Sequence, residues 1–397
     1  MSERVYLDWN ATAPLRPEAR AAVVAALDRA GNPSSVHAEG RAARGLVETA
    51  REAVAALVGA EPRNVVFTSG GTEANALALT PALTPALTLG AAEGRFDRLL
   101  VSAIEHASVR CGGRFPTNAV DIVPVTPAGL VDLEALAARL AALRTENAGF
   151  RLLVSLMHAN NETGVVQPIA AAADLVHAAG GILHVDAVQS AGKIPCDINA
   201  LGADLMSLSG HKLGGPQGTG ALVARAALHV ADPLLKGGGQ ERGFRAGTEN
   251  VAAIAGFGAA AAAAARDLAA DAPAMVALRD GLEAQVTAAS PKTAVIGAGA
   301  PRLPNTSLLA HPGFKAETAL IALDLAGVAV SSGAACSSGK VGASQVLAAM
   351  GVPPAIAAGA VRVSLGPTTT ERDVTAFVGA WNGLVLRLSR GGCGIAA

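Results

Sequence analysis

The sequence predicts an α/β fold in which a large domain on a mostly parallel sheet is joined to a smaller α+β domain. The first observation behind this prediction is that short apolar segments alternate with longer helical stretches along residues 65–208. Such alternation is typical of parallel strands joined by crossover helices. The second is that the later half has a different character, with a glycine-rich loop and scattered short apolar segments. The third is length, because 397 residues exceed one ordinary core.

The composition is that of a helix-rich globular protein, with 51% hydrophobic and only 3% aromatic residues. The formal net charge of -1 gives no support for binding nucleic acid or an acidic membrane. The first residues do not combine a basic segment with an apolar one, so we expect no secretory signal. The longest apolar run, at 251–265, is shorter than the roughly 20 residues that span a bilayer. It predicts a packed helix, and we expect no membrane association.

The four cysteines lie far apart and form no Cys-x-x-Cys pair; they are Cys111, Cys196, Cys336 and Cys393. This spacing argues against a disulfide framework or a zinc site. We therefore expect a reducing, cytoplasmic location and no intrinsic metal site.

The first part of the chain is predicted to contain an extended segment and two helices before the first strand. Pro17 suits the first turn of a helix, and Ser34 or Ser35 can cap the helix that follows. The predicted elements are an extended segment at 6–14, a helix at 17–29, a turn at 32–35, a helix at 39–58 and a strand at 65–68.

A glycine turn, Ser69-Gly70-Gly71-Thr72-Glu73, leads from the strand at 65–68 into another predicted helix. A strand, a glycine turn and a helix start place free backbone N–H groups at the positive end of the helix dipole, which suits a phosphate. The motif is shorter than a P-loop and lacks its lysine, so a P-loop is excluded. Taken alone, a plain capped turn explains it equally well.

Further strands are predicted at 99–101, 152–157, 181–185 and 205–208, and residues 80–92 are predicted to be a loop or broken helix. Polar residues follow the strand ends: Thr72, His106, Asn161, Asp186, Gln189, Ser209, His211 and Lys212. Because ligands bind outside the carboxyl ends of strands in open α/β sheets, we expect one shared site. Each residue alone also has an ordinary structural explanation.

Lys212 is the residue around which we expect this site to form. The strand at 205–208 leads into Ser209-Gly210-His211-Lys212, and several glycines follow the lysine closely. A lysine at a strand end, with glycines that let other groups approach, suits a Schiff-base amine. For this motif alone, a solvated loop lysine is an equally good explanation.

The later half is predicted to form the smaller domain. A glycine- and arginine-rich loop at 237–250 precedes an Ala-rich helix at 251–270 that links the two domains. Strands are predicted at 293–297, 305–309, 327–331 and 361–365, and residues 331–340 form a loop of small residues around Cys336. We place the large domain at 13–260 and the small domain at 1–12 and 261–397.

The polar residues at the strand ends, together with Arg362, could supply the groups that pyridoxal phosphate and an amino-acid substrate require. Lys212 offers the amine, and Asp186 offers a carboxylate that keeps the pyridine nitrogen protonated. His106 offers a flat group over the ring, and Arg362 offers a guanidinium for the carboxylate of an amino-acid substrate. An anion cradle is available from Gly71, Thr72, Ser209 and His211.

Motifs along nearly the whole chain, in order, carry a family resemblance. They lie at 6–8, 11–12, 32–37, 68–73, 105–106, 160–164, 184–190, 209–212, 237–243, 247–248, 331–336 and Arg362. Through them the sequence strongly resembles the cysteine desulfurases, pyridoxal-phosphate enzymes of fold type I (aspartate aminotransferase-like) in the class V aminotransferase group. Together these motifs are highly specific. One departure is Gly214, where many relatives carry a larger residue, often tyrosine.

The resemblance implies a role for each matching residue. Lys212 would bind the cofactor and move protons, Asp186 would pair with the pyridine nitrogen, and His106 would stack on the ring and take part in catalysis. Cys336 would attack the sulfur of bound L-cysteine, giving L-alanine and a cysteine persulfide. Asn161 and Gln189 would bond the ring hydroxyl.

The resemblance also implies how the phosphate and the substrate are held. The phosphate would be bound by Gly71, Thr72, Ser209 and His211. Thr248 from the second subunit of a homodimer would join them. Arg362 and Asn161 would bind the substrate.

The surroundings of Cys336 suit a sulfur carrier, because its small neighbours allow motion and no bulky apolar residue hides the thiol. Cys111, Cys196 and Cys393 lack this context and are predicted to be buried or tail thiols. The form Ser-Ser-Gly-x-Ala-Cys resembles the branch that supplies nitrogenase and general iron–sulfur assembly. It implies an iron–sulfur scaffold or another acceptor protein as partner, and Cys336 could transiently ligate a cluster.

The alternative function is that of a selenocysteine lyase or another class V aminotransferase. A transaminase has no need of an exposed cysteine on a flexible loop, so Cys336 argues against one. Selenium and sulfur substrates are harder to separate by sequence. A sulfur-delivery protein without catalysis is expected to lack Lys212 or Asp186, and both are present.

Overall fold

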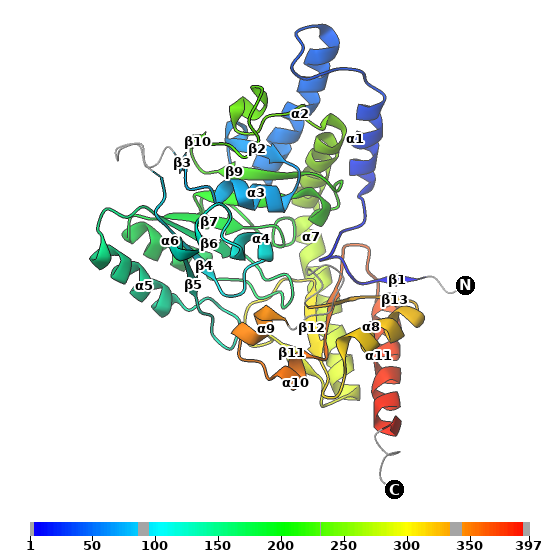
Figure 1. Ribbon diagram of the computed structural model, residues 1–397. Coiled ribbons are helices and arrows are strands. Elements are labelled where there is room, and N and C mark those ends of the chain that lie inside the picture. The colour runs from blue at the N-terminus through cyan, green and yellow to red at the C-terminus, as the bar shows by residue number, and fades with distance from the viewer. Residues whose placement is uncertain (1–3, 86–94, 231, 334–343, 392–397) are drawn as a thin grey trace.

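The structure is a computed structural model that describes residues 4–85, 95–230, 232–333 and 344–391. The described residues form a seven-stranded sheet and a four-stranded sheet, joined by the long helix α7, Val251–Ala289 (Figure 1). The predicted combination of a large α/β part and a smaller α+β part is therefore confirmed.

The seven-stranded sheet has the order β2-β9-β8-β7-β6-β4-β5. Only β9 is antiparallel to its neighbours, and every other pair in this sheet is parallel. All residues of β6 are buried, because helices cover both faces of a parallel sheet. The strands are β2 Val65–Thr68, β4 Arg98–Ser102, β5 Val120–Val123, β6 Leu152–Met157, β7 Ile182–Asp186, β8 Leu205–Ser209 and β9 Gly220–Ala224.

Alternate residues of these strands face two separate cores. Val65 and Phe67 of β2 pack with α1, α2, α5, α6 and α7, whereas Val66 packs in the core that contains α3. Helices α1, α2 and α7 lie side by side (Figure 1). The helices are α1 Pro17–Leu27, α2 Ala38–Leu57, α3 Gly71–Ala78, α4 Ala107–Arg110, α5 Leu133–Glu146 and α6 Ile169–Ala178.

The four-stranded sheet is antiparallel, with the order β11-β12-β15-β14. It packs on α8 and α11 around the fully buried Trp381. Its strands and helices are β11 Ala294–Ile296, β12 Thr306–Ala310, β14 Ser331–Ser332, β15 Ala360–Ser364, α8 Ala316–Leu325, α9 Gln345–Ala349, α10 Pro354–Ala357 and α11 Glu371–Gly391.

The N-terminal segment runs alongside this smaller sheet and then reaches the larger one. β1, Val5–Tyr6, pairs in parallel with β13, Val328–Ala329. Asp8 then forms a bridge with Ser364 of β15. The backbone N–H of Ala13 donates to the carbonyl of His211, just past β8. Residues 8–13 therefore lie between the ends of the two sheets.

Among the described helices, only α7 is long and apolar enough to cross a membrane, with a mean hydropathy of 1.4 over its most apolar window. In the structure 56% of that window is buried, and the helix packs on α1, α2 and α11. These contacts are those of a core helix, as predicted. α7 continues past the predicted end near residue 270 to Ala289, with Pro273 inside it. The predicted boundary between residues 260 and 261 lies within α7, and the division into two domains stays a prediction.

Several elements differ from the prediction for physical reasons. The segment predicted as one strand at 327–331 forms two short strands, β13 and β14, which join different sheets. β5 is a partly exposed edge strand, and β9 follows directly after a glycine-rich turn, so neither has a strong strand signal. The predicted loop at 80–92 contains β3, Leu83–Pro85, which pairs with β10, Leu228–Val230. Residues 86–92 lie outside the described residues.

Candidate active site

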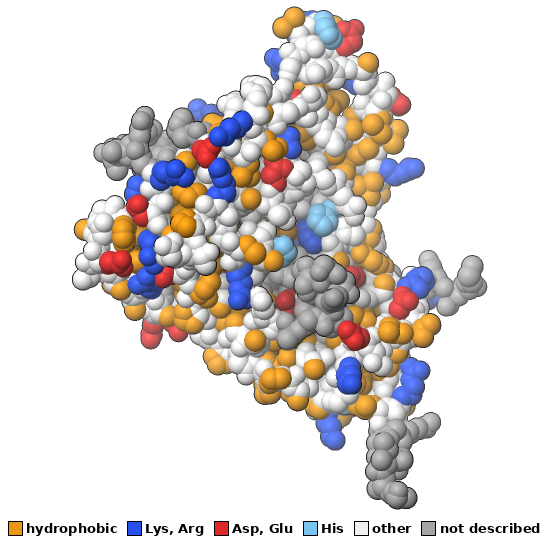
Figure 2. Space-filling view, in the orientation of Figure 1, with side chains coloured by type: hydrophobic (Ala, Val, Ile, Leu, Met, Phe, Trp, Pro, Cys, Tyr) orange, Lys and Arg blue, Asp and Glu red, His pale blue; other side chains and the backbone are white. Residues whose placement is uncertain are grey.

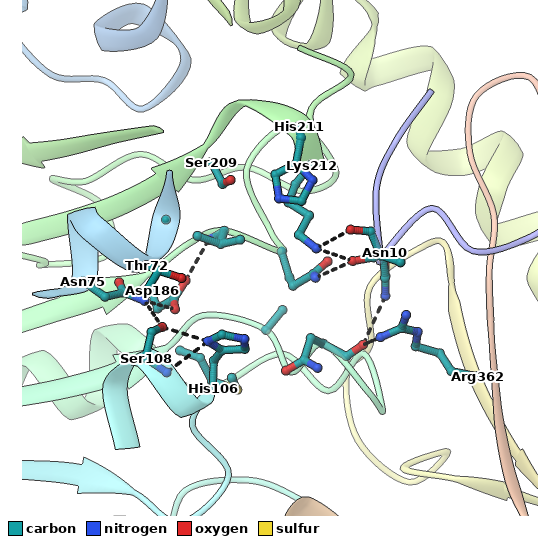
Figure 3. A pocket seen from close by; sticks show the side chains of 17 residues that line it. Asn10, Thr72, Asn75, His106, Ser108, Asp186, Ser209, His211, Lys212 and Arg362 are labelled. Atoms are coloured by element: carbon teal, nitrogen blue, oxygen red, sulfur yellow. Dashed lines mark hydrogen bonds between the residues drawn. The ribbon is translucent and has the colours of Figure 1, made fainter. Parts of the chain in front are cut away.

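A cavity of about 290 Å³ lies beyond the carboxyl ends of β6, β7 and β8, on the side that faces the smaller sheet (Figure 3). In the space-filling view, histidine side chains are visible in a hollow of this face (Figure 2). The predicted site residues that line the cavity are Gly71, Thr72, His106, Asn161, Asp186, Gln189, Ser209, His211, Lys212 and Arg362. The structure thus brings together residues that are up to 291 positions apart in the sequence.

Lys212 ends a short 3-10 turn, Gly210–Lys212, that follows β8 directly. A side chain at Gly210 would come within 2.4 Å of the Thr219 hydroxyl, so this turn requires glycine. The Nζ of Lys212 donates to the carbonyl oxygens of Asn10 and Ala11, at 2.7 Å each (Figure 3). The N-terminal segment therefore holds the amine in the cavity.

Asp186 is the last residue of β7 and is only 6% exposed. One carboxylate oxygen accepts from Nδ2 of Asn75 at 2.8 Å, and the other accepts from the backbone N–H of Val188 at 3.0 Å. No ion pair among the described residues includes Asp186. A buried carboxylate that lacks a cationic side-chain partner is suited to a protonated ring nitrogen.

His106 is fixed by Ser108, two residues further on. The backbone N–H of Ser108 donates to Nδ1 of His106 at 3.2 Å, and its hydroxyl lies 2.8 Å from the same nitrogen. Because Nδ1 accepts, the neutral ring carries its proton on Nε2. Nδ2 of Asn75 donates to the Ser108 hydroxyl at 2.9 Å, so Asn75 joins His106 to Asp186 (Figure 3).

Glu105, the neighbour of His106, is a buried carboxylic acid. Burial is the main cause that raises its pKa to about 8, and the charge on Asp186 raises it further. One oxygen of Glu105 accepts from the Ser102 hydroxyl and from the backbone N–H of Met157. We therefore expect Glu105 to be neutral at pH 7, which leaves Asp186 as the negative charge of this region.

The start of α3 forms an anion cradle at one end of the cavity. A side chain at Gly71 would meet Val188 at 2.7 Å, so glycine is needed where the helix begins. Nδ1 of His211 lies 2.8 Å from the Thr12 hydroxyl. Burial, followed by the charges of Lys212 and Lys193, lowers the pKa of His211 to about 4. A neutral His211, the hydroxyls of Thr72 and Ser209 and the helix dipole can bind a phosphate.

Arg362 of β15 closes the opposite end of the cavity and is 2% exposed. It donates from Nη1 to the carbonyl of Asn161 at 3.0 Å and from Nη2 to the carboxylate of Asp8 at 2.8 Å. Its Nε is buried without a hydrogen-bond partner. These bonds fix the plane of the guanidinium at the wall of the cavity, where its charge can pair with an anionic ligand.

One predicted residue is not brought into this cavity, and another lies outside the described residues. Thr248 is exposed, lies between Gly243 and α7, and does not line the cavity of its own chain. Cys336 lies outside the described residues. Before and after that stretch, Gly333 and Ser344 both approach Glu162: the Ser344 hydroxyl donates to Oε2 of Glu162 at 2.6 Å, and a side chain on Gly333 would meet the same oxygen. Burial raises the pKa of Glu162 to about 7.

The remaining cysteines differ from each other. Cys196 is buried, as predicted, and burial raises the pKa of its thiol to about 12. Cys111 is exposed, so the prediction of a buried thiol is wrong for it, because it lies just past the short helix α4. Cys393 is outside the described residues. Among the described residues, no cluster of His, Cys, Asp and Glu could hold a metal ion.

Several residues that hold the site were not among the predicted ones: Asn10, Asn75, Ser108 and Lys193. Asn75 follows Gly71 by four positions and so lies on the same face of the predicted helix, which is a usable signal. Ser108 follows His106 by two positions, where a local side-chain bond is common. Lys193 follows its partner Gln189 by four positions, whereas Asn10 acts through partners far away in the sequence and carries no such signal.

The fold and the cavity define a fold type I α/β enzyme. Its lysine follows β8, and its aspartate ends the neighbouring strand β7. The family model for aminotransferase class-V matches residues 5–377. The chain belongs to the class-V aminotransferase family and, within it, to the cysteine desulfurases, as the resemblance predicted.

The relatives that support this assignment cover most of the chain. It is 44% identical to a cysteine desulfurase of Cereibacter sphaeroides, over 94% of this chain and 93% of that protein. It is 39% identical to the cysteine desulfurase NifS of Azotobacter vinelandii, over 93% and 90%. The X-ray structure of a NifS-like protein from Rickettsia africae superposes with a TM-score of 0.85 at 36% identity, covering 96% of this chain and 99% of that one.

Proposed function

We propose that this chain is a pyridoxal-phosphate-dependent cysteine desulfurase. It would remove sulfur from L-cysteine, release L-alanine and carry the sulfur as a persulfide on Cys336 for an acceptor protein. The observation that carries the proposal is the cavity in which Lys212, Asp186, His106 and Arg362 meet. Relatives support it: the proteins from Cereibacter sphaeroides and Azotobacter vinelandii are both named cysteine desulfurase.

The described residues fit pyridoxal phosphate. The cradle at the start of α3 suits its phosphate, since a side chain at Gly71 would fill the space. Asp186, buried and without a cationic side-chain partner, suits its pyridine nitrogen. Lys212 places its amine between these two groups and Arg362 (Figure 3). When bound, the cofactor supplies an electron sink that weakens bonds at the substrate Cα and the neighbouring C–S bond.

The chain's own residues then orient the substrate and move protons. The Nζ of Lys212 would bind the cofactor and afterwards carry the proton of the substrate Cα. The imidazole of His106 would stack on the ring, with its Nε2 proton directed by the bond that Ser108 makes to Nδ1. Asn161 and Gln189 line the cavity and would bond the ring hydroxyl.

Substrate binding would depend on Arg362. Its Nε has no partner in the described structure, and Asp8 and the Asn161 carbonyl hold the group in place. A substrate carboxylate would pair with this guanidinium through a charge-assisted bond. The solved structure titled "SspA in complex with cysteine" is similar to this chain, with a TM-score of 0.75 at 28% identity, covering 92% of this chain and 100% of that one. That similarity supports L-cysteine as the ligand.

The transfer step balances with Cys336 as the nucleophile. The thiolate of Cys336 attacks the substrate sulfur, an S–S bond forms, and the C–S bond breaks with its electrons going to carbon. Carbon takes up a proton to give the methyl group of L-alanine. The enzyme is left with a persulfide that an iron–sulfur scaffold or another acceptor can remove. Nitrogenase supply and transient cluster ligation by Cys336 are part of this proposal.

We also propose a cytoplasmic homodimer with shared sites. Thr248 is exposed and lies outside its own chain's cavity, as expected if it completes the phosphate site of the partner. Large apolar side chains are exposed just before α1, on α1 and between α1 and α2, which suits a subunit interface. They are Leu15, Val24, Leu27 and Val36.

The test of the function combines product analysis with mapping of the cofactor lysine. The purified protein should release alanine and sulfide from L-cysteine. Borohydride reduction followed by peptide mapping should label Lys212, and Lys212→Ala should lose both the cofactor colour and turnover. A label on another lysine would overturn the assignment. Faster turnover of L-selenocysteine would favour a selenocysteine lyase, and a keto-acid product would favour a transaminase.

A further inference from the structure

Lys193 is a buried lysine that the proposed reaction does not use. It lies in the turns after β7 and is only 8% exposed. Its Nζ donates to Oδ1 of Asn10 at 3.1 Å and to Oε1 of Gln189 at 3.0 Å. Both acceptors are neutral amides, and no ion pair among the described residues includes Lys193. A buried ammonium group without a carboxylate partner is costly, so its presence here calls for a reason.

Lys193 fixes the orientation of the side-chain amide of Gln189. An ammonium group only donates, so Gln189 must turn its oxygen toward Lys193 and its NH2 group away. That NH2 group donates to the carbonyl of Asn10 at 3.0 Å. Gln189 lines the main cavity, and its second NH2 hydrogen can serve an acceptor oxygen of a ligand there.

Lys193 is also linked to Lys212 through one residue. The carbonyl of Asn10 accepts from Lys212 at 2.7 Å, while the side chain of the same asparagine accepts from Lys193. Both lysines line a second cavity of about 30 Å³, which is large enough to hold a water molecule. A positive charge on Lys193 therefore lies close behind the nitrogen of Lys212.

The charges around Lys193 repel one another. Burial, followed by the charges of Lys212 and Arg362, lowers the pKa of Lys193 to about 7. Two other titratable groups are coupled to it: the thiol of Cys196, whose raised pKa of about 12 leaves it neutral, and the imidazole of His211, whose lowered pKa of about 4 also leaves it neutral. Coupling between two sites is mutual, so protonated Lys193 disfavours a proton on the Lys212 nitrogen.

We propose that Lys193 is a positioning residue that orients the Gln189 amide toward the cofactor and places a positive charge behind Lys212. It does not line the main cavity, so it acts through Gln189, Asn10 and its own charge. The inference rests on the proposed function, because it requires the cofactor on Lys212. Its consequence is that the Lys212 nitrogen releases its proton at a lower pH than it would beside a neutral residue.

The test follows the cofactor absorbance of the loaded protein against pH, without substrate. This absorbance reports the protonation of the nitrogen that joins the cofactor to Lys212. Lys193→Met removes the charge and the donor, and should raise the midpoint by roughly one pH unit or more. Lys193→Gln keeps a donor without the charge and should raise it similarly. Lys236→Met is the matched control, because that lysine is 70% exposed and pairs with Asp232; its midpoint should equal that of the wild type.

The outcomes distinguish a failure of the proposed role of Lys193 from a failure of the proposed function. A wild-type midpoint in both Lys193 variants would overturn the role of Lys193 and leave the proposed function standing. If Lys193→Met does not fold, the midpoint of Lys193→Gln decides alone. A wild-type protein whose bound cofactor shows no attachment to Lys212 would overturn the proposed function and this inference with it.

Discussion

The cavity has two sides that are built differently. The lysine side, which comprises Lys212, Asp186 and His106, stands directly after strands of one sheet. The arginine side comprises Arg362, Asp8 and Asn10. Its ion pair joins Arg362 to Asp8, which are 354 positions apart in the sequence. On the lysine side both oxygens of Asp186 already accept hydrogen bonds, whereas on the arginine side the Nε–H donor of Arg362 has no acceptor. This difference fits a preformed binding site for the cofactor on the lysine side and a site for the exchanging substrate on the arginine side.

The largest effect is expected from Cys336, the residue proposed to carry the sulfur. Cys336→Ala should keep the cofactor and still bind substrate, but turnover should fall roughly a thousandfold or more, because a free thiol or water lacks the positioning of a tethered thiol. Alanine release from L-cysteine measures this. The matched controls are Cys111→Ala, Cys196→Ala and Cys393→Ala. If Cys336→Ala turns over like the wild type, or if one control alone is inactive with cofactor bound, the assignment of the sulfur carrier is wrong.

The second prediction separates the two sides by kinetics. Arg362→Lys should raise KM by roughly 100-fold, about 2–3 kcal/mol, because a lysine cannot reproduce the guanidinium's bonds to a carboxylate. The cofactor spectrum should not change. Asp186→Asn is the matched change on the lysine side, and should lower kcat with a smaller effect on KM. Equal losses of cofactor binding in both variants would show that the two sides do not act separately.

The third prediction concerns the pH dependence of stability on the lysine side. Glu105 has a folded-state pKa of about 8 against 4.5 unfolded, so the folded chain keeps a proton that the unfolded chain loses as pH rises. Its contribution to stability is therefore full below about pH 4.5 and is lost progressively up to pH 8. Glu105→Gln removes this loss. Between pH 5 and pH 8 the wild type should lose on the order of 3 kcal/mol more than the variant.

Chemical unfolding at the two pH values measures the difference for Glu105. Glu61→Gln, at a side chain that is 64% exposed, is the control and should follow the wild type. Parallel behaviour of Glu105→Gln and the wild type would mean that Glu105 is ionised in the folded protein.

The smallest effect is expected where the lysine turn meets the N-terminal segment. Gly214 has a φ of +83°, and a side chain there would come within 2.7 Å of Arg16. Gly214→Ala should lower the free energy of unfolding by about 1–2 kcal/mol while keeping the cofactor. Gly218→Ala is the control, because Gly218 has a φ of +79° but nothing within 4 Å, and it should lose only about 1 kcal/mol. Equal losses would show that the contact with Arg16 has no cost.

The two sides also differ in how far the sequence predicts them. Strand ends with polar residues predict the lysine side, because parallel strands bring their carboxyl ends to one edge. The contact of Lys193 with Asn10, at a separation of 183 positions, has no local signal and needs the folded chain. The sequence predicts an arginine on a strand at Arg362, but it does not predict the ion pair of that arginine with Asp8.

For the fold, the same reasoning holds. Buried parallel strands such as β6 have continuous apolar runs and are predicted with bounds close to those observed. The antiparallel β9 is not, because it follows a glycine-rich turn and its direction depends on pairing between β2 and β8. The pairing of β13 with β1 and of β14 with β15 also depends on partners that are distant in the sequence.

Asn10 makes the order of synthesis matter for this protein. It is synthesised about 300 residues or more before its partners, because its side chain bonds Thr306 and Asn305 and its backbone N–H bonds Ser364. The carbonyl that holds Lys212 therefore cannot be fixed in place until Ser364 has been made. A nascent chain would carry the strands, the aspartate and the lysine early, but it would form a complete pocket only after Ser364 has been made. Cofactor capture would then mark the finished fold rather than guide its first steps.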